Sequence, residues 1–120
     1  NLDSVKIKEF LTDILKSLAH SDMRSQDFFS IDGNNTKMHI EQAIPLGMII
    51  HELATNSIKY AWNLNQNKKI DIHIENNNGT LILSYNDNGK GLPENLNIKI
   101  FRIKISRFVY SSAVKRQYGL

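Results

Sequence analysis

One stripe of a long helical pattern carries four polar side chains that could bind a phosphorylated ligand. It holds Glu52, Asn56, Lys59 and Tyr60, at positions i, i+4, i+7 and i+8 of an α-helix. A carboxamide oxygen can ligate a hard cation such as Mg²⁺, and an ammonium group can neutralise a phosphate. A carboxylate can orient or deprotonate a hydroxyl group or a water molecule. The same residues would also suit the solvated side of an amphipathic helix, so the stripe alone leaves both interpretations open.

A second candidate is the stretch SYNDNGKGLP at residues 84–93, where an apolar run stops at an acid and two glycines follow. Asp87 ends the run, and its carboxylate could accept a hydrogen bond from an exocyclic amine such as that of adenine. Gly89 and Gly91 permit a positive φ and a close approach of the backbone to a ring or a phosphate. A hairpin turn or a calcium-binding loop would also fit, although the further acidic ligands of an EF-hand do not follow.

Two helices that could position these stretches are predicted from the spacing of apolar residues. They lie within residues 2–20 and 41–62. Asp3 or Ser4 could cap the first helix, and Pro45 suits the second helix only in its first turn. The stripe of the second helix that should face a sheet consists of Leu46, Ile49, Ile50, Leu53, Ser57 and Ala61.

Two hairpins are predicted from strand and turn signals. Residues 27–40 look like two short strands around a Gly-Asn-Asn turn. Apolar and polar residues alternate at 68–75, a turn signal follows at 76–79, and a returning strand is predicted at 80–87. The order of helix, hairpin, helix and hairpin predicts an α+β fold: a two-layer α/β sandwich with the helices packed on one face of a mixed β-sheet.

Length and composition indicate a single soluble globular domain. The chain has 120 residues, of which 41% are hydrophobic and 22% charged. No apolar stretch approaches the roughly 18–20 residues of a membrane span, and no signal-peptide pattern is present. We therefore expect a cytoplasmic domain without membrane contact. The absence of cysteine excludes disulfides and thiolate chemistry.

Charge is distributed unevenly along the chain. Residues 1–94 hold nine Lys/Arg and twelve Asp/Glu, which gives −3, whereas residues 95–120 hold six Lys/Arg and no acid, which gives +6. A basic segment can contact phosphates or an acidic partner, and it can equally be a solvated end. We expect no nucleic-acid partner for this segment.

Both polar stretches resemble motifs of one known family. HELATNSIKYA at 51–61 resembles the N box, and DNGKGLP at 87–93 the first glycine box, of the ATP-binding domain of sensor histidine kinases. This domain belongs to the superfamily that includes gyrase, Hsp90 and MutL. The Glu-Leu-x-x-Asn pattern is similar to that of one kinase branch, and Asn56 with Lys59 resembles the kinases more than the gyrase-like ATPases. The similarity covers roughly residues 4–96 and implies a Bergerat-type fold that binds ATP and Mg²⁺.

The resemblance implies a role for each residue of the helical stripe. Asn56 would hold Mg²⁺ against the phosphates of the nucleotide. Glu52 would bind or orient around the metal site, at the position where gyrase-like relatives keep their general base. Lys59 would contact phosphate, and Tyr60 would lie along the nucleotide.

At the strand end, the resemblance implies that Asp87 reads the amino group of adenine while Gly89 and Gly91 shape the pocket wall. The implied function is to bind Mg-ATP for phosphoryl transfer to a histidine on a separate dimerisation helix, within a two-component system that includes a response regulator. None of the four histidines of this chain fits the phosphoacceptor role, so we expect that helix to lie outside it.

The last part of the chain departs from the family pattern. Residues 99–120 lack the second glycine box, and Ile105 stands where a glycine would let backbone amides cradle phosphates. We expect a histidine-kinase-like ATP-binding domain at residues 1–98, followed by a truncated or diverged segment in place of the ATP lid. Two alternatives stay open: a regulatory nucleotide-binding module without catalysis, and an ATP hydrolase that activates water with Glu52. Whether this chain alone is an enzyme is also left open.

Overall fold

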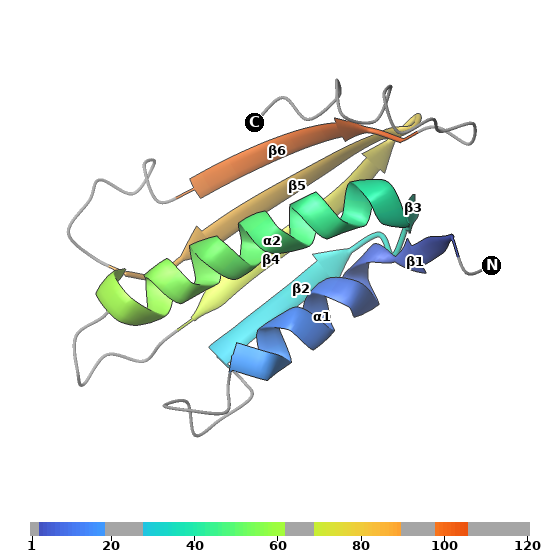
Figure 1. Ribbon diagram of the computed structural model, residues 1–120. Coiled ribbons are helices and arrows are strands. Elements are labelled where there is room, and N and C mark those ends of the chain that lie inside the picture. Colours follow the sequence, from blue (N-terminus) through green and yellow to red (C-terminus); the bar gives the residue numbers. More distant parts are fainter. Residues whose placement is uncertain (1–2, 19–27, 62–68, 90–97, 106–120) are drawn as a thin grey trace.

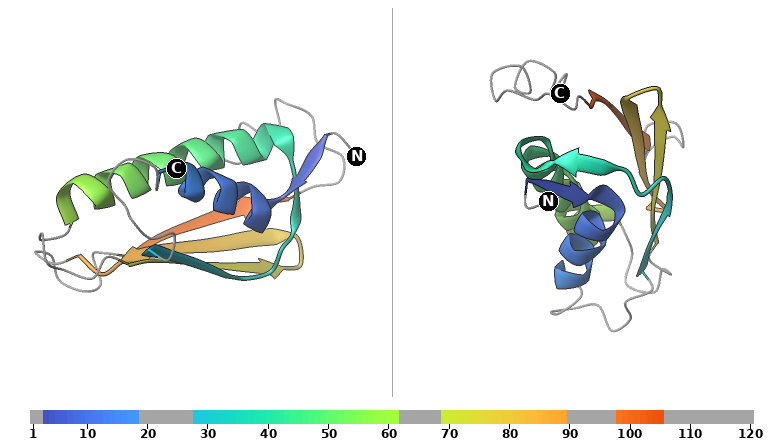
Figure 2. Two further views of the ribbon diagram at one scale, coloured as in Figure 1. Left: turned by 90° about the horizontal axis from the view of Figure 1, so that it is seen from below. Right: turned by 90° about the vertical axis from the view of Figure 1, so that its right-hand side faces the viewer.

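The computed structural model describes residues 3–18, 28–61, 69–89 and 98–105 of the chain (Figure 1). In this part of the chain, two α-helices cover one face of a four-stranded sheet, and a second sheet of two short strands lies at one end (Figure 2). The elements in chain order are β1 (Ser4–Lys6), α1 (Ile7–Ser17), β2 (Phe29–Gly33), β3 (Lys37–His39), α2 (Ile40–Asn56), the π-helical turn η3 (Ser57–Ala61), β4 (Ile70–Asn77), β5 (Thr80–Asp87) and β6 (Ile98–Lys104). The predicted α+β sandwich is confirmed.

The main sheet has the strand order β2-β4-β5-β6 and is mixed. β2 runs parallel to β4, while β4–β5 and β5–β6 are antiparallel pairs. β6 lies in the basic part of the chain and pairs with β5 over its whole length, so the basic segment begins as a strand of the sheet. The strands of the β4–β5 hairpin form as predicted. They are joined by Asn78 and Gly79, which both have a positive φ, of 52° and 89°, as a tight two-residue hairpin turn requires.

The prediction of a hairpin within residues 27–40 was wrong: both strands form, but they do not pair with each other. β2 pairs with β4, and β3 pairs with β1 in the small sheet. Gly33 ends β2 with φ 105°, and the N–H of Asn34 donates to the carbonyl oxygen of Ile74 at 2.9 Å. A strand–turn–strand signal cannot distinguish local pairing from pairing with distant strands.

The first helix begins later than predicted. Residues 4–6 form β1, and α1 begins at Ile7 with Lys6 as its N-cap, which makes no capping hydrogen bond through its side chain. The prediction that Asp3 or Ser4 caps this helix was therefore wrong. Instead, the carbonyl oxygen of Asp3 accepts a hydrogen bond from the N–H of Ile40, at the start of α2.

The second helix confirms its prediction and differs in detail. Its N-cap is His39, whose Nδ1 accepts a hydrogen bond from the N–H of Glu41 at 3.2 Å. Since the helix begins at Ile40, Pro45 lies in its second turn and not in the first. Its last residue, Asn56, leads directly into the π-helical turn.

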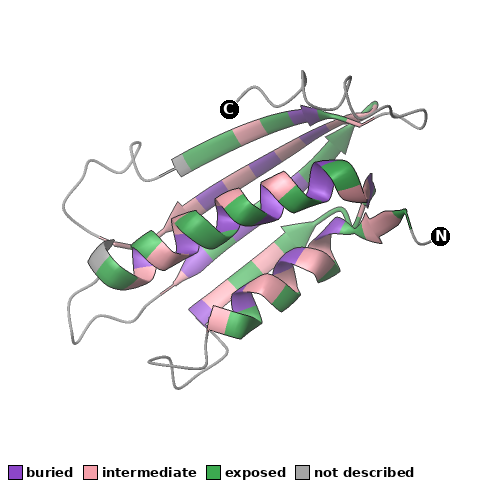
Figure 3. Cartoon of the chain, viewed as in Figure 1, coloured by how far each residue is buried: buried purple, intermediate pink, exposed green. Residues whose placement is uncertain are grey.

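The core lies between the helices and the sheet and follows the periodicities of both (Figure 3). Alternate residues of β4 and β5 point inward, and α1 and α2 contribute residues one turn apart. Gln42 is also fully buried, and its Nε2 donates to the carbonyl oxygen of Lys104 at 2.7 Å, which joins the start of α2 to the end of β6. The largest fully buried side chains are Ile7, Leu11, Leu15, Met38, Leu46, Ile50, Ile70, Ile72, Ile74, Leu81, Leu83 and Ile103. Among the described helices, none has the length and apolarity needed to cross a membrane.

Substitution of Gly33 by alanine should destabilise the fold. A Cβ at this position would lie 2.0 Å from the carbonyl oxygen of Ile74, and its φ of 105° is unfavourable for any residue with a side chain. We expect Gly33→Ala to lower the free energy of unfolding in urea by more than about 2 kcal/mol. Gly79→Ala is the matched control, since φ is 89° there but the nearest atom is 3.5 Å away. Equal losses in the two variants would contradict the predicted clash.

Candidate functional site

The end of α2 lies against the end of β5, and this contact brings the two sequence motifs together (Figure 1). Ser57 Oγ donates a hydrogen bond to Asp87 Oδ2 at 2.5 Å. Asn56 directly precedes Ser57, so the helix end that carries the N-box motif is fixed beside the strand end that carries the glycine-box motif. The sequence placed these motifs apart; the fold makes them neighbours.

A buried tyrosine extends this contact into the core. The hydroxyl group of Tyr85 lies 2.7 Å from Ser57 Oγ. Tyr85 is 2% exposed and Ser57 4%, whereas Asp87 is half-buried. Ser57 faces the sheet, as predicted, but sequence reasoning counted it as part of an apolar stripe and assigned no site role to Tyr85. A signal was available: Tyr85 and Asp87 are two residues apart on one strand, so they point to the same face.

The second oxygen of Asp87 is bound by the loop that follows β5. Gly89 N–H donates to Asp87 Oδ1 at 2.9 Å, which is a local turn closed by an aspartate side chain. The loop is also joined to the residue before β4: Asn88 N–H donates to the carbonyl oxygen of Lys69, and Lys69 N–H donates to Asn88 Oδ1, each at 3.0 Å. Asp87 is therefore held from the helix side and from the loop side.

The electrostatics of the site depend on the burial of Tyr85. Burial raises the pKa of Tyr85 well above its ordinary value near 10, and the negative charge of Asp87 raises it further. The phenol therefore keeps its proton at every physiological pH. It serves as a neutral hydrogen-bonding group beneath a carboxylate.

The predicted polar stripe is exposed along α2, but it does not continue as a regular α-helix. Glu52, Asn56 and Lys59 are all exposed. After Asn56, the chain forms a π-helical turn, with wider i→i+5 hydrogen bonding, so the spacing that placed Lys59 and Tyr60 on the stripe no longer holds. Such turns are frequent at functional sites. The side chain of Tyr60 lies outside the described residues, and so does Gly91.

The described residues fit Mg²⁺ only as a partner of phosphate oxygens. Within this part of the chain, no group of three or more His, Cys, Asp or Glu side chains could hold a metal ion. Asn56 and Glu52 nevertheless offer exposed oxygen atoms one helical turn apart. Mg²⁺ is usually bound by one or two protein oxygens, several waters and the phosphates of a substrate, and this donor set suits that mode.

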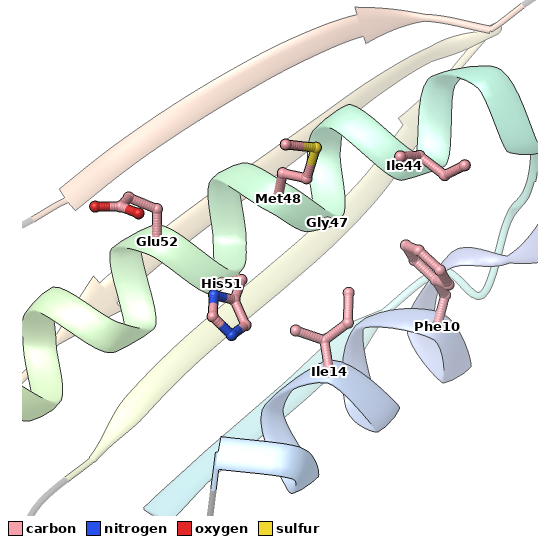
Figure 4. A pocket seen from close by; sticks show the side chains of 7 residues that line it. All are labelled: Phe10, Ile14, Ile44, Gly47, Met48, His51 and Glu52. Atoms are coloured by element: carbon pink, nitrogen blue, oxygen red, sulfur yellow. The ribbon is translucent and has the colours of Figure 1, made fainter.

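A separate apolar groove lies between α1 and α2 (Figure 4). It has a volume of about 480 Å³. Ile44 and Met48 are 50% and 68% exposed in it. Gly47 lets the helices approach closely, because a Cβ there would lie 2.8 Å from side-chain atoms of Phe10 and Ile14. The described residues that line it are Phe10, Ile14, Ile44, Gly47, Met48, His51 and Glu52. The Ser57–Asp87 contact is not part of this lining.

Three of the four histidines lie in the described residues, at positions unlike one another. His39 caps α2, and His51 is exposed on α2 beside the groove. His73 lies on the sheet face away from the helices, where its Nδ1 is 2.8 Å from Asp32 Oδ1. His20 lies outside the described residues. That none of them is the phosphoacceptor stays a prediction.

Comparison with known proteins places the chain in a family. The profile of the family described as "Histidine kinase-, DNA gyrase B-, and HSP90-like ATPase" matches residues 41–120, and the chain belongs to this family. The chain is also similar to the heme sensor protein HssS of Staphylococcus haemolyticus, with 28% identity over 125 residues, which cover 98% of this chain and 24% of that protein.

Solved structures show the same fold. A histidine kinase domain from a blue-light-activated kinase of Erythrobacter litoralis EL346 has a TM-score of 0.61 and 21% identity, covering 76% of this chain and 42% of that one. The catalytic domain of the histidine kinase ThkA has a TM-score of 0.55 and 20% identity, covering 78% and 62%. The family match identifies a histidine kinase-, gyrase B- and HSP90-like ATPase domain, in agreement with the motifs, and its fold is that of solved histidine kinase catalytic domains.

The raised pKa of Tyr85 predicts a loss of stability at alkaline pH. The unfolded chain releases the phenol proton near pH 10, while the folded chain retains it, so rising pH favours unfolding above that value. At pH 11, ionisation of this phenol in the unfolded chain lowers the free energy of unfolding by about 1.4 kcal/mol. We expect Tyr85→Phe to be less stable than wild type at pH 8 but to lose about 1.4 kcal/mol less between pH 9 and 11 in urea unfolding. Parallel pH profiles for the two proteins would contradict the raised pKa.

Proposed function

We propose that this chain binds Mg-ATP as the catalytic domain of a sensor histidine kinase, with Asp87 as the group that reads adenine. The observation that carries the proposal is the contact between Ser57 and Asp87, because it joins the N-box helix end to the glycine-box strand end. A carboxylate that is already held by two protein donors has free lone pairs in a fixed direction. An exocyclic amine is a donor that matches them.

The phosphates would lie along the exposed side of the end of α2. Asn56 would ligate Mg²⁺ together with phosphate oxygens, and Lys59 would neutralise phosphate charge. Glu52 would orient the groups around the metal site. Bound Mg²⁺ supplies charge neutralisation at the phosphates, and phosphoryl transfer depends mostly on such neutralisation and on positioning. The exposure of Glu52, Asn56 and Lys59 supports this assignment, since each is available to a ligand.

Two further residues and the last segment complete the proposed site. Tyr60 would lie along the nucleotide, and Gly91 would shape the pocket wall with Gly89. Residues 99–120 would replace the ATP lid, and their missing glycine box should weaken the cradle for phosphates. The start of this segment forms β6, which is a strand of the main sheet.

The activity of a whole kinase would require partners beyond this chain. The chain spans about a quarter of the length of HssS, to which it is similar. We propose that the phosphoacceptor histidine lies on a dimerisation helix outside residues 1–120 and that a response regulator receives the phosphoryl group. A cytoplasmic location, in a protein that can be attached to a membrane elsewhere, is part of the same proposal.

Removal of the proposed adenine and metal ligands should weaken binding in two distinguishable ways. Loss of a hydrogen bond to a charged group costs about 1.5–3 kcal/mol, so Asp87→Asn should lower the affinity for a fluorescent ATP analogue roughly 10- to 100-fold, with or without Mg²⁺. Asn56→Ala should lose only the part of the affinity that depends on Mg²⁺. Titration of fluorescence with and without Mg²⁺ measures both effects.

Matched substitutions on other surfaces control for charge and stability. Asp71→Asn removes an exposed carboxylate from the opposite sheet face, and Asn77→Ala removes an exposed carboxamide at the end of β4. Both variants should bind as wild type does. Failure of the wild-type chain to bind at millimolar nucleotide would contradict the proposal, and so would equal losses in Asp87→Asn and Asp71→Asn.

A further inference from the structure

Three side chains form a continuous hydrogen-bonded chain from the core to the proposed adenine site. They come from two elements: Ser57 begins the π-helical turn, and Tyr85 and Asp87 lie on β5. The separations are 2.7 Å from Tyr85 OH to Ser57 Oγ and 2.5 Å from Ser57 Oγ to Asp87 Oδ2. Neither Ser57 nor Tyr85 is accessible enough to serve as a surface contact, so their hydroxyl groups act on the site through Asp87.

The hydrogen bonds of this chain run in one direction. The carboxylate of Asp87 accepts the hydroxyl proton of Ser57, which has no second proton to donate. The hydrogen bond between Ser57 and Tyr85 must therefore be donated by the phenol. Burial raises the pKa of Tyr85, so this donor remains protonated. Every hydroxyl dipole in the chain points toward the carboxylate, and neighbouring hydrogen bonds of this kind strengthen one another.

The arrangement fixes the orientation of the carboxylate before any ligand arrives. Oδ2 is held by Ser57 and Oδ1 by the N–H of Gly89 at 2.9 Å. A carboxylate has about four acceptor positions, so two protein donors leave capacity for a donor of the ligand. Groups that are ordered in advance lose less freedom on binding, and the gain appears as affinity and selectivity.

We propose that Ser57 and Tyr85 are positioning residues that make Asp87 selective for a nucleobase bearing an exocyclic amine. This inference rests on the proposed function, in which Asp87 contacts adenine. A base that presents a carbonyl oxygen at the same position would place two acceptors against each other. A base that presents hydrogen there would gain nothing from the carboxylate. The hydroxyl group of Ser57 should thus matter for ATP and not for a nucleotide that lacks the amine.

The test compares ATP with purine riboside triphosphate, which has hydrogen in place of the 6-amino group. Affinities are measured by competition against a fluorescent ATP analogue, for wild type, Ser57→Ala, Ser57→Thr and Tyr85→Phe. Ser84→Ala is the matched control, since Ser84 is the neighbour of Tyr85 and points to the opposite sheet face. Urea unfolding of each variant shows whether it is folded, and only folded variants are compared. Tyr85→Phe keeps the ring and serves as the second test variant if Ser57→Ala does not fold, with a smaller expected loss of the preference for ATP.

We expect wild type to prefer ATP and Ser57→Ala to lose about tenfold of its affinity for ATP, with the affinity for the deaminated analogue unchanged. Tyr85→Phe should lose a smaller part of the preference, and Ser57→Thr and Ser84→Ala should keep it. Equal losses for both nucleotides, or a preference that survives in Ser57→Ala and Tyr85→Phe, would overturn the positioning role while leaving ATP binding intact. A wild type that binds both nucleotides equally would overturn the role of Asp87 itself, and with it this inference.

Discussion

The proposed site depends on a hydrogen bond between the two layers of the structure, from Ser57 at the end of the long helix to Asp87 at the end of β5. The hydrophobic effect has no direction, so apolar packing does not by itself orient polar groups at the surface of the core. The bond from Gln42 to Lys104 fixes the start of α2 on the sheet, and the hydroxyl-to-carboxylate bond of 2.5 Å fixes its end. It sets where Asn56, Lys59 and the loop after β5 lie relative to one another, and the proposed nucleotide site is built on that registration.

The π-helical turn begins at Ser57, the residue that makes this contact. If the α-helix continued past Asn56, residues three and four positions apart would stay on the same face, exposed or buried. The wider turn that begins at Ser57 changes the spacing where the buried face meets Asp87 and the exposed face carries Lys59. Buried and exposed side chains alternate within the four residues 56–59: Asn56 and Lys59 are open to solvent, and Ser57 is 4% exposed. The apolar groove between α1 and α2 shares Glu52 with the proposed site, but neither Ser57 nor Asp87 lines it.

Regular periodicity made most helices and strands predictable. The pairing between strands that are distant in the sequence could not be predicted. The strands at 70–77 and 80–87 follow from strict alternation and an Asn-Gly turn, and α2 follows from its apolar stripe. The hairpin expected at residues 27–40 failed because pairing partners are chosen by tertiary contacts, which lie beyond a local signal. In the site, motif residues such as Asn56 and Asp87 could be named in advance. The spacing of Tyr85 and Asp87 on one strand indicated a shared face, but the hydrogen bonds of Tyr85 and Ser57 could not be predicted, because a core tyrosine and a serine within an apolar stripe look like packing until the partner atoms are known.

The most direct test of the central claim is an NMR titration of the isotope-labelled chain with Mg-ATP. The hydroxyl group of Ser57 and the backbone N–H of Gly89 bind the two oxygens of the Asp87 carboxylate, so the amide resonances of these two residues report on the proposed site. Those of Phe10 and Met48 report on the groove. If Asp87 binds adenine, the resonances of Ser57 and Gly89 should shift in a saturable way while those of Phe10 and Met48 stay unchanged. Saturable shifts at Phe10 and Met48, with Ser57 and Gly89 unmoved, would contradict the account.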